Sequence, residues 1–412
     1  MELQFAAQSY RARSAPLAAQ RCVNMFVERS PALAKTRVPV FMFPGLDEFA
    51  RFGTGPINGL HIMATAGVSG STVAVSNERL FALSGGALYE ITEDGLAVLI
   101  GQTNLGGLVS MADNRVQMAM VDGEVGWVYQ PGGLNQVTLA TAASGATSIT
   151  AATIGTLEVG ATIKIPLDNG LTHTTTIAPG GSGPAWNRTI PLAAALPGVV
   201  TAGAAAYLPS VVLGQITAPA FQPADTVVYF DSYFVFNAHN SNQFFISASQ
   251  DGTQYDGNDF ASAEANPDSL LAVINYHEQL LLCGTRSIEV WYDAGAANFP
   301  FQRFDGAFIH RGLAASLAIV QEDNTVFWLG EDGIFYRLDG YAPRRISTFG
   351  TETAWQSYPT FNDATAFVIT IEGHKFIFLD FPSGNGTWCY DISSGVEEPL
   401  WYERVSSGEK WV

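Results

Sequence analysis

The sequence predicts an all-β protein built as a six-bladed β-propeller. Three observations predict it. A strand–turn–strand unit occurs six times, the units recur roughly every 40–50 residues, and the 412-residue chain holds 41 glycines and 20 prolines, the residues that separate short strands by turns. A hydrophobic content of 47% supplies a sizeable core, whereas charged residues make up only 14%.

The repeated unit consists of an apolar strand, a short polar turn and a second apolar strand. The turns hold Asn, Asp, Glu, Gly or His, which tolerate tight reversals of the chain. A third strand with an aromatic residue follows each unit. The six copies are residues 72–83, 108–120, 226–237, 270–284, 317–330 and 366–380, and the six aromatic anchors are Tyr89, Tyr129, Phe245, Tyr292, Tyr336 and Tyr390.

The spacing of these anchors indicates blades. Successive anchors are 40, 116, 47, 44 and 54 residues apart, and removing a 69-residue insert from the long gap leaves 47. Such a period, with three or four strands per unit, is typical of propellers, in which each blade packs on the next and closure protects the sheet edges. A meandering β-sandwich is the alternative.

The insert, residues 140–208, has a composition of its own. It is rich in Ala, Thr and Gly and carries only Glu158, Asp168, Lys164 and Arg188 as charged residues. Short stretches alternate apolar and polar residues, and Asp168-Asn169-Gly170 is a hairpin signal. We therefore expect a small β domain grafted into the second blade, with the propeller formed by residues 52–139 and 209–412. A disordered linker is the alternative.

Residues 1–51 lack the repeat. Pro31, Pro39 and Pro44 favour an extended arm or collar. This segment has seven Lys/Arg and four acidic residues, although the whole chain has a formal charge of −18. We expect Arg11, Arg13 and Arg21 to bind a partner, because arginine forms charge-assisted bonds with carboxylates. Bonds to carboxylates of the same subunit are the alternative.

The acidic body argues against binding of nucleic acid phosphates, since counterion release needs a basic surface. No apolar run reaches the ~20 residues that span a bilayer, and no signal peptide pattern begins the chain. Three widely spaced cysteines, Cys22, Cys283 and Cys389, fit reduced thiols of a protein assembled in a cytoplasm.

Motifs for catalysis or metal binding are missing from the sequence. There is no nucleophile elbow, no paired-histidine zinc motif and no phosphate-binding glycine loop, so we expect no catalytic residues, no metal and no cofactor. Asp251, Asp256 and Asp259 fail the EF-hand spacing and are better explained as turn residues. The Arg344-Arg345 pair is a candidate phosphate contact, but we favour a blade edge or a neighbouring subunit as its partner.

Several motifs resemble a known family, the packaged-DNA stabilisation proteins or tail nozzles of short-tailed phages. They are DFASAEANPD (259–268), SIEVWYDAG (287–295), FPFQR (299–303), VFWLGEDG (326–333) and YRLDGYAPRRIS (336–347). The opening SYRARSAPLAAQRCVNMFVE (9–28) is also similar, but has MFVE where the family favours a Leu-Tyr-Pro-Glu type of sequence.

The resemblance implies a structural, non-enzymatic protein of the virion tail. It implies a homo-hexameric ring below the portal and adaptor rings that holds a central needle or fibres, closes the DNA channel and conducts the genome on ejection. An acidic lumen wall would let DNA pass without specific binding, and simple solubility is the alternative explanation of the net charge. Assembly would occur in the bacterial cytoplasm. The family leads us to expect a closing stretch after the sixth unit, supplied by N-terminal strands or by further C-terminal sequence.

Two other functions remain open at this point. The first is a virion glycosidase or lyase acting on host surface polysaccharide, since the acidic residues allow many carboxylate pairs on paper. The second is a receptor-binding module in which the insert contacts the host. Neither accounts for the motifs of residues 259–347.

Overall fold

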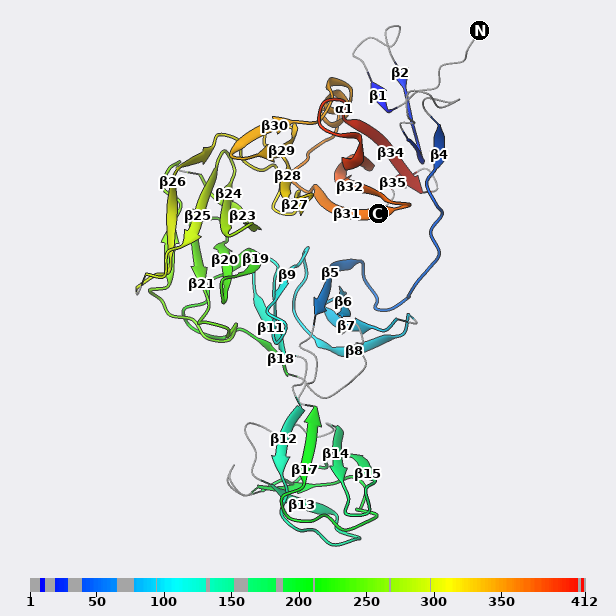
Figure 1. The fold of residues 1–412 in the computed structure, drawn as a ribbon, viewed down its shortest axis with the longest axis vertical. Helices are drawn as coiled ribbons and strands as arrows, with labels where there is room; N and C mark the ends of the chain where they lie inside the picture. Colours follow the sequence, from blue (N-terminus) through cyan, green and yellow to red (C-terminus); the bar gives the residue numbers. More distant parts are fainter. Residues whose placement is uncertain are drawn as a thin grey trace.

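A computed structural model describes residues 8–11, 19–28, 39–64, 78–93, 95–130, 134–151, 162–182, 188–209, 212–266, 268–296, 298–406 and 409–410. Six antiparallel sheets surround a common axis, and a separate lobe projects from one side (Figure 1). The predicted all-β, six-bladed propeller is confirmed.

Each blade is a meander whose strands pair in sequence order. The residues in the turns between the first and second strands adopt the backbone conformation that a tight hairpin needs. Asp231 and Ser232, at φ 48° and 78°, join two strands of blade three, and Glu372 and Gly373, at φ 50° and 85°, join two of blade six. Positive φ at both central residues matches the twist of the flanking strands.

Four blades are uninterrupted in the sequence. Blade one comprises β5 (Ile57–Ala64), β6 (Glu78–Ser84), β7 (Ala87–Ile91) and β8 (Ala97–Gln102). Blade three comprises β19 (Ala224–Phe230), β20 (Tyr233–Ala238), β21 (Gln243–Ile246) and β22 (Phe260–Ser262). Blade four comprises β23 (Leu270–Tyr276), β24 (Gln279–Gly284), β25 (Ile288–Asp293) and β26 (Phe301–Ile309). Blade five comprises β27 (Ile319–Glu322), β28 (Thr325–Leu329), β29 (Phe335–Asp339) and β30 (Ala342–Arg345).

Blades two and six are elaborated. Blade two comprises β9 (Ser110–Asp113), β10 (Met118–Val121), β11 (Gly126–Gln130) and, beyond the insert, β18 (Val212–Gln215). Blade six comprises β31 (Thr365–Ile371), β32 (His374–Phe381), β33 (Gly386–Asp391), β34 (Leu400–Ser406) and β35 (Glu409–Lys410). All six predicted aromatic anchors lie in the third strand of a blade. The first strand expected for unit one, at the start of residues 72–83, lies outside the described residues, and β5 is the first strand of blade one.

Helical structure is short in the described residues. The α-helix α1 (Phe349–Trp355) joins blade five to blade six, and two single-turn helices, η1 (Pro382–Gly384) and η2 (Ile392–Ser394), flank β33. No helix among the described residues has the length and apolar character needed to cross a membrane.

Consecutive blades are held together by apolar clusters. Phe81 of blade one packs with Met118 and Tyr129 of blade two, and Phe327 of blade five packs with Leu379 of blade six. The interfaces between blades two and three, three and four, and four and five are built in the same way. Burial of these faces is the main source of stability, because apolar burial contributes roughly 25 cal/mol per Å².

The face of blade six that is turned away from blade five packs on the arm. Phe26 and Phe43 are buried against Phe376 and Tyr402 in one cluster. Residue Val23 forms a parallel bridge with Glu403. The described part of the arm is therefore docked on blade six of its own chain. It comprises β1 (Tyr10–Arg11), β2 (Ala19–Gln20), β3 (Met25–Val27) and β4 (Val40–Met42).

The insert is a β domain with a core of its own, whose buried side chains, such as Ile149, Ile163 and Ile190, all lie in the insert. It enters between the third and fourth strands of blade two (Figure 1). Its first strand begins at Leu134 and pairs with a strand that ends at Pro209, so the expected boundaries 140–208 were too narrow. The strands are β12 (Leu134–Thr138), β13 (Ser148–Ala151), β14 (Thr162–Pro166), β15 (Thr172–Thr176), β16 (Arg188–Pro191) and β17 (Ala205–Pro209).

Candidate interaction surfaces

The predicted partner-binding arginines come from two distant parts of the sequence that lie at one end of the molecule. Arg344 and Arg345 are in β30, Arg11 is in β1, and Arg21 follows β2. Figure 1 shows these strands at the end opposite the insert, and α1 contacts β1 there. Arg13 lies outside the described residues, and for Arg11 the structure describes only the backbone.

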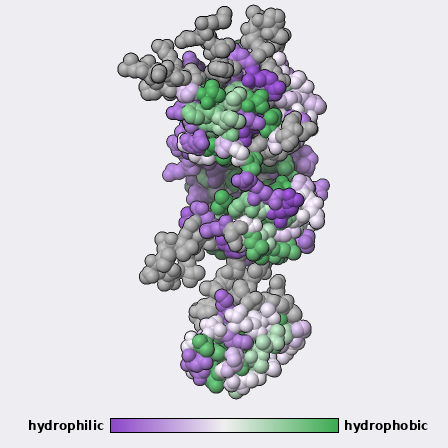
Figure 2. Space-filling model, turned by 90° about the vertical axis from the view of Figure 1, so that its right-hand side faces the viewer, coloured by the Kyte–Doolittle hydropathy of each residue, from purple (hydrophilic) through white to green (hydrophobic). Residues whose placement is uncertain are grey.

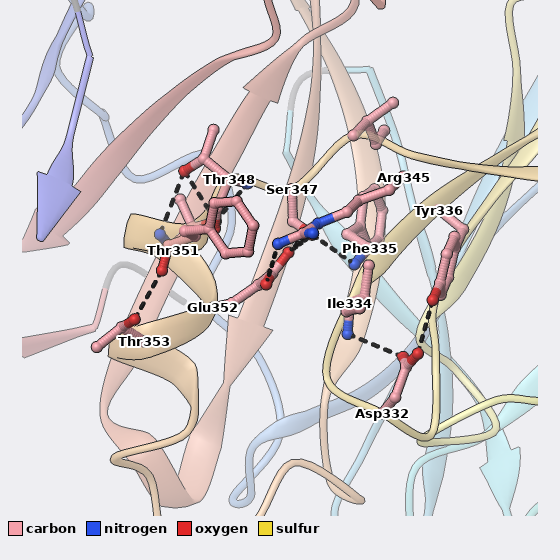
Figure 3. Close-up of polar contacts among 12 residues, drawn as sticks. Asp332, Ile334, Phe335, Tyr336, Arg345, Ser347, Thr348, Thr351, Glu352 and Thr353 are labelled. Carbon is pink, nitrogen blue, oxygen red and sulfur yellow. Dashed lines mark hydrogen bonds and ion pairs between the residues drawn. The ribbon is translucent and has the colours of Figure 1, made fainter. Parts of the chain in front are cut away.

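Arg345 is bound by a carboxylate of its own chain. Its Nε and Nη2 donate to the two oxygens of Glu352 at 2.7 and 2.5 Å, the bidentate geometry that makes arginine–carboxylate pairs strong. The Glu352 side chain is only 8% exposed, and the Ser347 hydroxyl also donates to it, at 2.6 Å. Figure 3 shows Arg345 and Ser347 converging on Glu352.

The start of α1 places Glu352 at this position. Thr348 is the N-cap, and it forms a reciprocal capping box with Thr351, which satisfies amide groups of the first turn (Figure 3). The helix is then anchored by Trp355, which is fully buried against Trp401. Arg345 also lies over the ring of Phe349, 4.1 Å from its centroid. The pair is thus a structural link between β30 and α1.

Arg344 makes weaker contacts at the surface. Its Nη2 donates to Glu397 Oε1 at 2.6 Å, and its Nη1 lies 3.5 Å from Asp339 Oδ2. The hydrogen bond to Glu397 raises the pKa of Arg344. Because the Glu397 side chain is 86% exposed, this ion pair is solvated and contributes little to stability.

Arg21 attaches the arm to blade six. Its Nη2 lies 2.5 Å from Glu403 Oε2, and Glu403 is buried in β34. The hydrogen bond to Glu403 raises the pKa of Arg21. Two backbone hydrogen bonds accompany this ion pair. The Asn24 N–H donates to Glu403 O, and the Glu403 N–H donates to Cys22 O. These bonds join the arm to β34 of blade six. The contact is the intramolecular alternative considered above, and binding of a partner by Arg21 stays a prediction.

Two pockets were considered as ligand sites. One, of about 460 Å³, lies between blades two and three beside the insert, and none of the residues lining it is Asp, Glu, Lys, Arg or His. The other, of about 80 Å³, lies where several blades converge and contains Asp122, Asp225 and Asp363. Asp122 accepts backbone N–H groups of residues 106, 124 and 125, and Asp363 accepts that of Ser383. These carboxylates hold loops in place.

The acidic stretch at residues 251–259 is built from turns, as its sequence indicates. Asp251 accepts hydrogen bonds from the amide and hydroxyl of Thr253, and Asp256 accepts one from the amide of Asn258. Burial of the Asp251 carboxyl raises its pKa, but the hydrogen bonds from Thr253 lower it, and the net result is a lowered pKa of Asp251. In the part of the chain that the structure describes, no three His, Cys, Asp or Glu side chains are grouped to hold a metal ion.

Sequence reasoning missed the residues that bind the arginines, namely Glu352, Glu397 and Glu403. These pairs join different elements, so no fixed spacing reveals them. It also missed that several apolar side chains within residues 40–62 and 96–99 are exposed. A signal existed in the uncharged run Ala97–Gln102, which forms the outer strand of blade one.

The chain was compared with known proteins. No curated protein matches it. Solved structures with similar architecture include Citrobacter koseri AztD, 12% identical with a TM-score of 0.37, covering 91% of this chain and 96% of that chain. Apo AztD from the same organism is 12% identical with a TM-score of 0.30, covering 79% and 93%. Catalytically inactive virginiamycin B lyase from Staphylococcus aureus with quinupristin is 10% identical with a TM-score of 0.29, covering 78% and 95%.

A family match covers more than half of the chain. Residues 190–410 match Phage_stabilise, described as bacteriophage P22 Gp10, beta-propeller. This stretch contains blades three to six, the last strand of blade two and all motifs noted between residues 259 and 347. The chain therefore belongs to the Phage_stabilise family of bacteriophage P22 Gp10 and is a phage structural protein built on a β-propeller.

Proposed function

We propose that this protein forms the nozzle of a phage tail, a ring of six copies that closes the DNA channel, retains packaged DNA and conducts it on ejection. The observation that carries the proposal is the family match over blades three to six. The virion tail is then its location, and assembly takes place in the host cytoplasm. It acts as a structural part and not as an enzyme.

The charge distribution supports a conduit. The chain has a formal charge of −18, and most of its described cationic side chains contact carboxylates of the same chain, as Arg79 does with Glu90 and Lys375 with Glu322. A surface of this kind offers few sites for counterion release and repels phosphates. DNA therefore slides through the lumen without being bound.

The basic arm is the proposed attachment element. It lies at the end of the propeller away from the insert (Figure 1). Arg11, Arg13 and Arg21 are assigned to the portal and adaptor rings above, and Arg344, whose partner Glu397 is exposed, to a neighbouring subunit, whereas Arg345 links β30 to α1. The central needle or the fibres occupy the channel. Arg21 would use its exposed half for this contact, since its side chain is 53% exposed beside Glu403.

A phage lacking this protein provides the test. Complementation with wild-type protein should give tails with a sixfold ring on the channel axis and heads that retain their DNA, as judged by electron microscopy and by nuclease-resistant DNA. The triple variant Arg11→Ala, Arg13→Ala, Arg21→Ala should leave folded protein unattached and heads that leak DNA.

Two outcomes would contradict the proposal. The first is retention of DNA at the wild-type level by heads without the protein. The second is hydrolysis or elimination of host polysaccharide by purified protein, which would favour an enzyme.

A further inference from the structure

One pocket of the propeller is lined without a charged side chain, although the chain as a whole carries 38 acidic residues. The pocket, of about 460 Å³, lies between blades two and three, at the foot of the insert. We call it the inter-blade pocket. Strand β11 and the segment 214–219 form one wall, and residues 253–255, between β21 and β22, form the other. Its volume falls within the range of ~300–1,000 Å³ that is typical of small-molecule sites.

The wall from blade two is fixed by hydrogen bonds and by aromatic packing. The Ile216 N–H donates to Gly126 O at 2.8 Å, and the Phe221 N–H donates to Ala218 O at 3.0 Å. Phe221 then packs on Tyr255, with ring centroids 5.1 Å apart, which connects this wall to the opposite one. A Cβ at Gly126 would overlap the Phe221 ring. Glycine at this position therefore permits the close approach that places the wall.

A buried amide joins the two walls. The Gln117 side chain belongs to a residue that is 8% exposed. Its Oε1 accepts the Gly252 N–H at 2.7 Å, and its Nε2 lies 3.4 Å from Asp251 Oδ1 and 3.5 Å from Gln130 Oε1. The Tyr255 hydroxyl closes the loop by donating to Gly252 O at 2.8 Å. Both walls are thus held in place by the fold itself, which reduces the cost of ordering them when a ligand binds.

The hydrogen-bonding groups of the pocket carry no charge. Amides and hydroxyls supply them, and each of these groups can both donate and accept hydrogen bonds. The remaining lining residues are apolar, except for Tyr255, whose hydroxyl is bonded to Gly252. The polar lining residues are Gln130, Gln215, Thr217, Thr253 and Gln254.

These properties favour an uncharged ligand with many hydroxyl groups. A phosphate or carboxylate ligand is usually bound by arginine or lysine, and neither lines the pocket. A purely apolar ligand would cover the amides without replacing their hydrogen bonds to water, which costs free energy. Asp251 adjoins the pocket, but its Oδ1 already accepts hydrogen bonds from Thr253 and Gln117. A neutral sugar fits best, because its hydroxyls match the amides and its C–H faces match the apolar residues.

We propose that the inter-blade pocket binds a neutral oligosaccharide of the host cell surface. The pocket lies toward the end of the molecule opposite the arm, next to the insert, which stands apart from the propeller body as a separate lobe (Figure 1, Figure 2). In the proposed nozzle the arm faces the phage head, so this end faces the host. The host assignment rests on that proposed function, whereas the sugar chemistry rests on the pocket alone. Since no carboxylate lines the pocket, the sugar is bound and not cleaved.

Amide hydrogen exchange of the full-length protein locates the site. Polysaccharide from the host surface is cut into oligosaccharides by limited acid hydrolysis, and anion exchange separates these into a neutral and an anionic fraction. The neutral fraction should slow exchange at residues 214–219 and 253–255. It should leave exchange at residues 134–209 of the insert unchanged.

A double variant removes two exposed amides from the pocket. Gln215→Leu combined with Gln254→Leu should weaken binding of the neutral fraction about ten-fold, the loss expected for two neutral hydrogen bonds. Gln302→Leu is the matched control, because it replaces an equally exposed type of amide on β26 of blade four. The control should bind like the wild type. Calorimetric titration with the neutral fraction compares the three proteins.

Three results would overturn the inference. They are binding of the anionic fraction alone or of neither fraction, protection of the insert in place of the pocket, and equal affinities of the double variant and the control. The proposed function is tested separately, because the double variant should still give tails with a sixfold ring and heads that retain DNA. Wild-type tails without a ring would reject the nozzle and the host-facing placement, but not binding of the sugar.

Discussion

Two adjacent arginines show how burial of the partner decides what an ion pair contributes. Arg345 bonds to a buried carboxylate, and Arg344 bonds to an exposed one. Removing Arg345 leaves Glu352 in a poorly solvated site where, among the described residues, Ser347 is the remaining side-chain donor. Hydrogen bonds to charged groups contribute about 1.5–3 kcal/mol, whereas exposed pairs contribute about 0–1 kcal/mol.

We therefore predict that Arg345→Ala lowers the free energy of unfolding by about 1.5–3 kcal/mol. Arg344→Ala, the matched control in the same strand, should leave it close to the wild-type value, because its partner Glu397 is exposed. Urea unfolding of both variants measures the difference. Equal effects of the two substitutions would show that β30 and α1 are not linked through Glu352.

Asp231 lies in a turn where carboxylates gather. Burial, Asp293 and Glu278 raise its pKa. The folded state therefore holds the proton more tightly than the unfolded state. The resulting stabilisation is present at low pH and is lost as the pH rises, so the carboxylate is unfavourable at neutral pH.

Asp231→Asn should raise the melting temperature slightly at pH 7, and the gain should vanish below about pH 4, where the unfolded carboxyl is protonated. Asn also tolerates the φ of 48° at this position. Calorimetry at pH 7 and at pH 3.5 gives the comparison. A gain of the same size at both pH values would assign the effect to the backbone and not to charge.

At the scale of elements, the arm illustrates what sequence can and cannot provide. Composition indicated an extended basic segment, yet Cys22, Phe26 and Phe43 form a core with blade six. Only a few apolar residues separated by prolines are involved, so no periodic pattern reveals them. Tertiary contacts with β32 and β34 decide their placement.

Phe26→Ala should destabilise the docked arm by about 3–5 kcal/mol, the usual cost of truncating a buried phenylalanine. Met42→Ala in the paired strand should have an effect within ~0.5 kcal/mol. Amide exchange of β34 and of residues 22–27 reports the change. If Phe26→Ala leaves exchange in both segments unchanged, the arm does not depend on this contact.

The insert is attached at a single hairpin position. Gln130 pairs with Val212, and Tyr129 pairs with Leu213, so the two strands of blade two meet where the insert departs. Replacing residues 131–211 by Asn-Gly would close them with a two-residue turn.

That deletion should give a folded, soluble propeller with one fewer calorimetric transition. Deleting 140–208 instead would leave β12 without β17 and should give a less soluble protein. Circular dichroism and calorimetry of the two deletions make the comparison. Loss of sheet signal in the first deletion would mean that the propeller needs the insert.

For the whole molecule, periodicity was sufficient for the architecture. Six hairpins and their aromatic anchors specify local pairs, and each blade packs on its sequence neighbour, so local information determines the global arrangement. A contact that escapes this rule lies on the far face of blade six, where the described residues of the arm pack. Contacts between residues so far apart in the sequence leave no local pattern of residues that would predict them.

Repulsion between acidic chains should make assembly depend on salt concentration. Contact between copies of a chain of formal charge −18 should strengthen with salt, since the screening length falls from about 30 Å at 0.01 M to about 8 Å at 0.15 M. Sedimentation of purified protein should show more association at the higher salt concentration. Weaker association would indicate that opposite charges, and not apolar surface, join the copies.

The position of the insert also orders events during synthesis. A ribosome completes β11 and then makes 81 further residues, 131–211, before β18 emerges. At about 5–20 residues per second this takes roughly 4–16 s, ample time for a small β domain to form by itself. During this time blade two consists of three strands. Its edge strand β11 pairs with β18 only after the whole insert has been synthesised. A slow step in folding of the insert would therefore delay closure of this blade in the nascent chain, even though the two structures share no core.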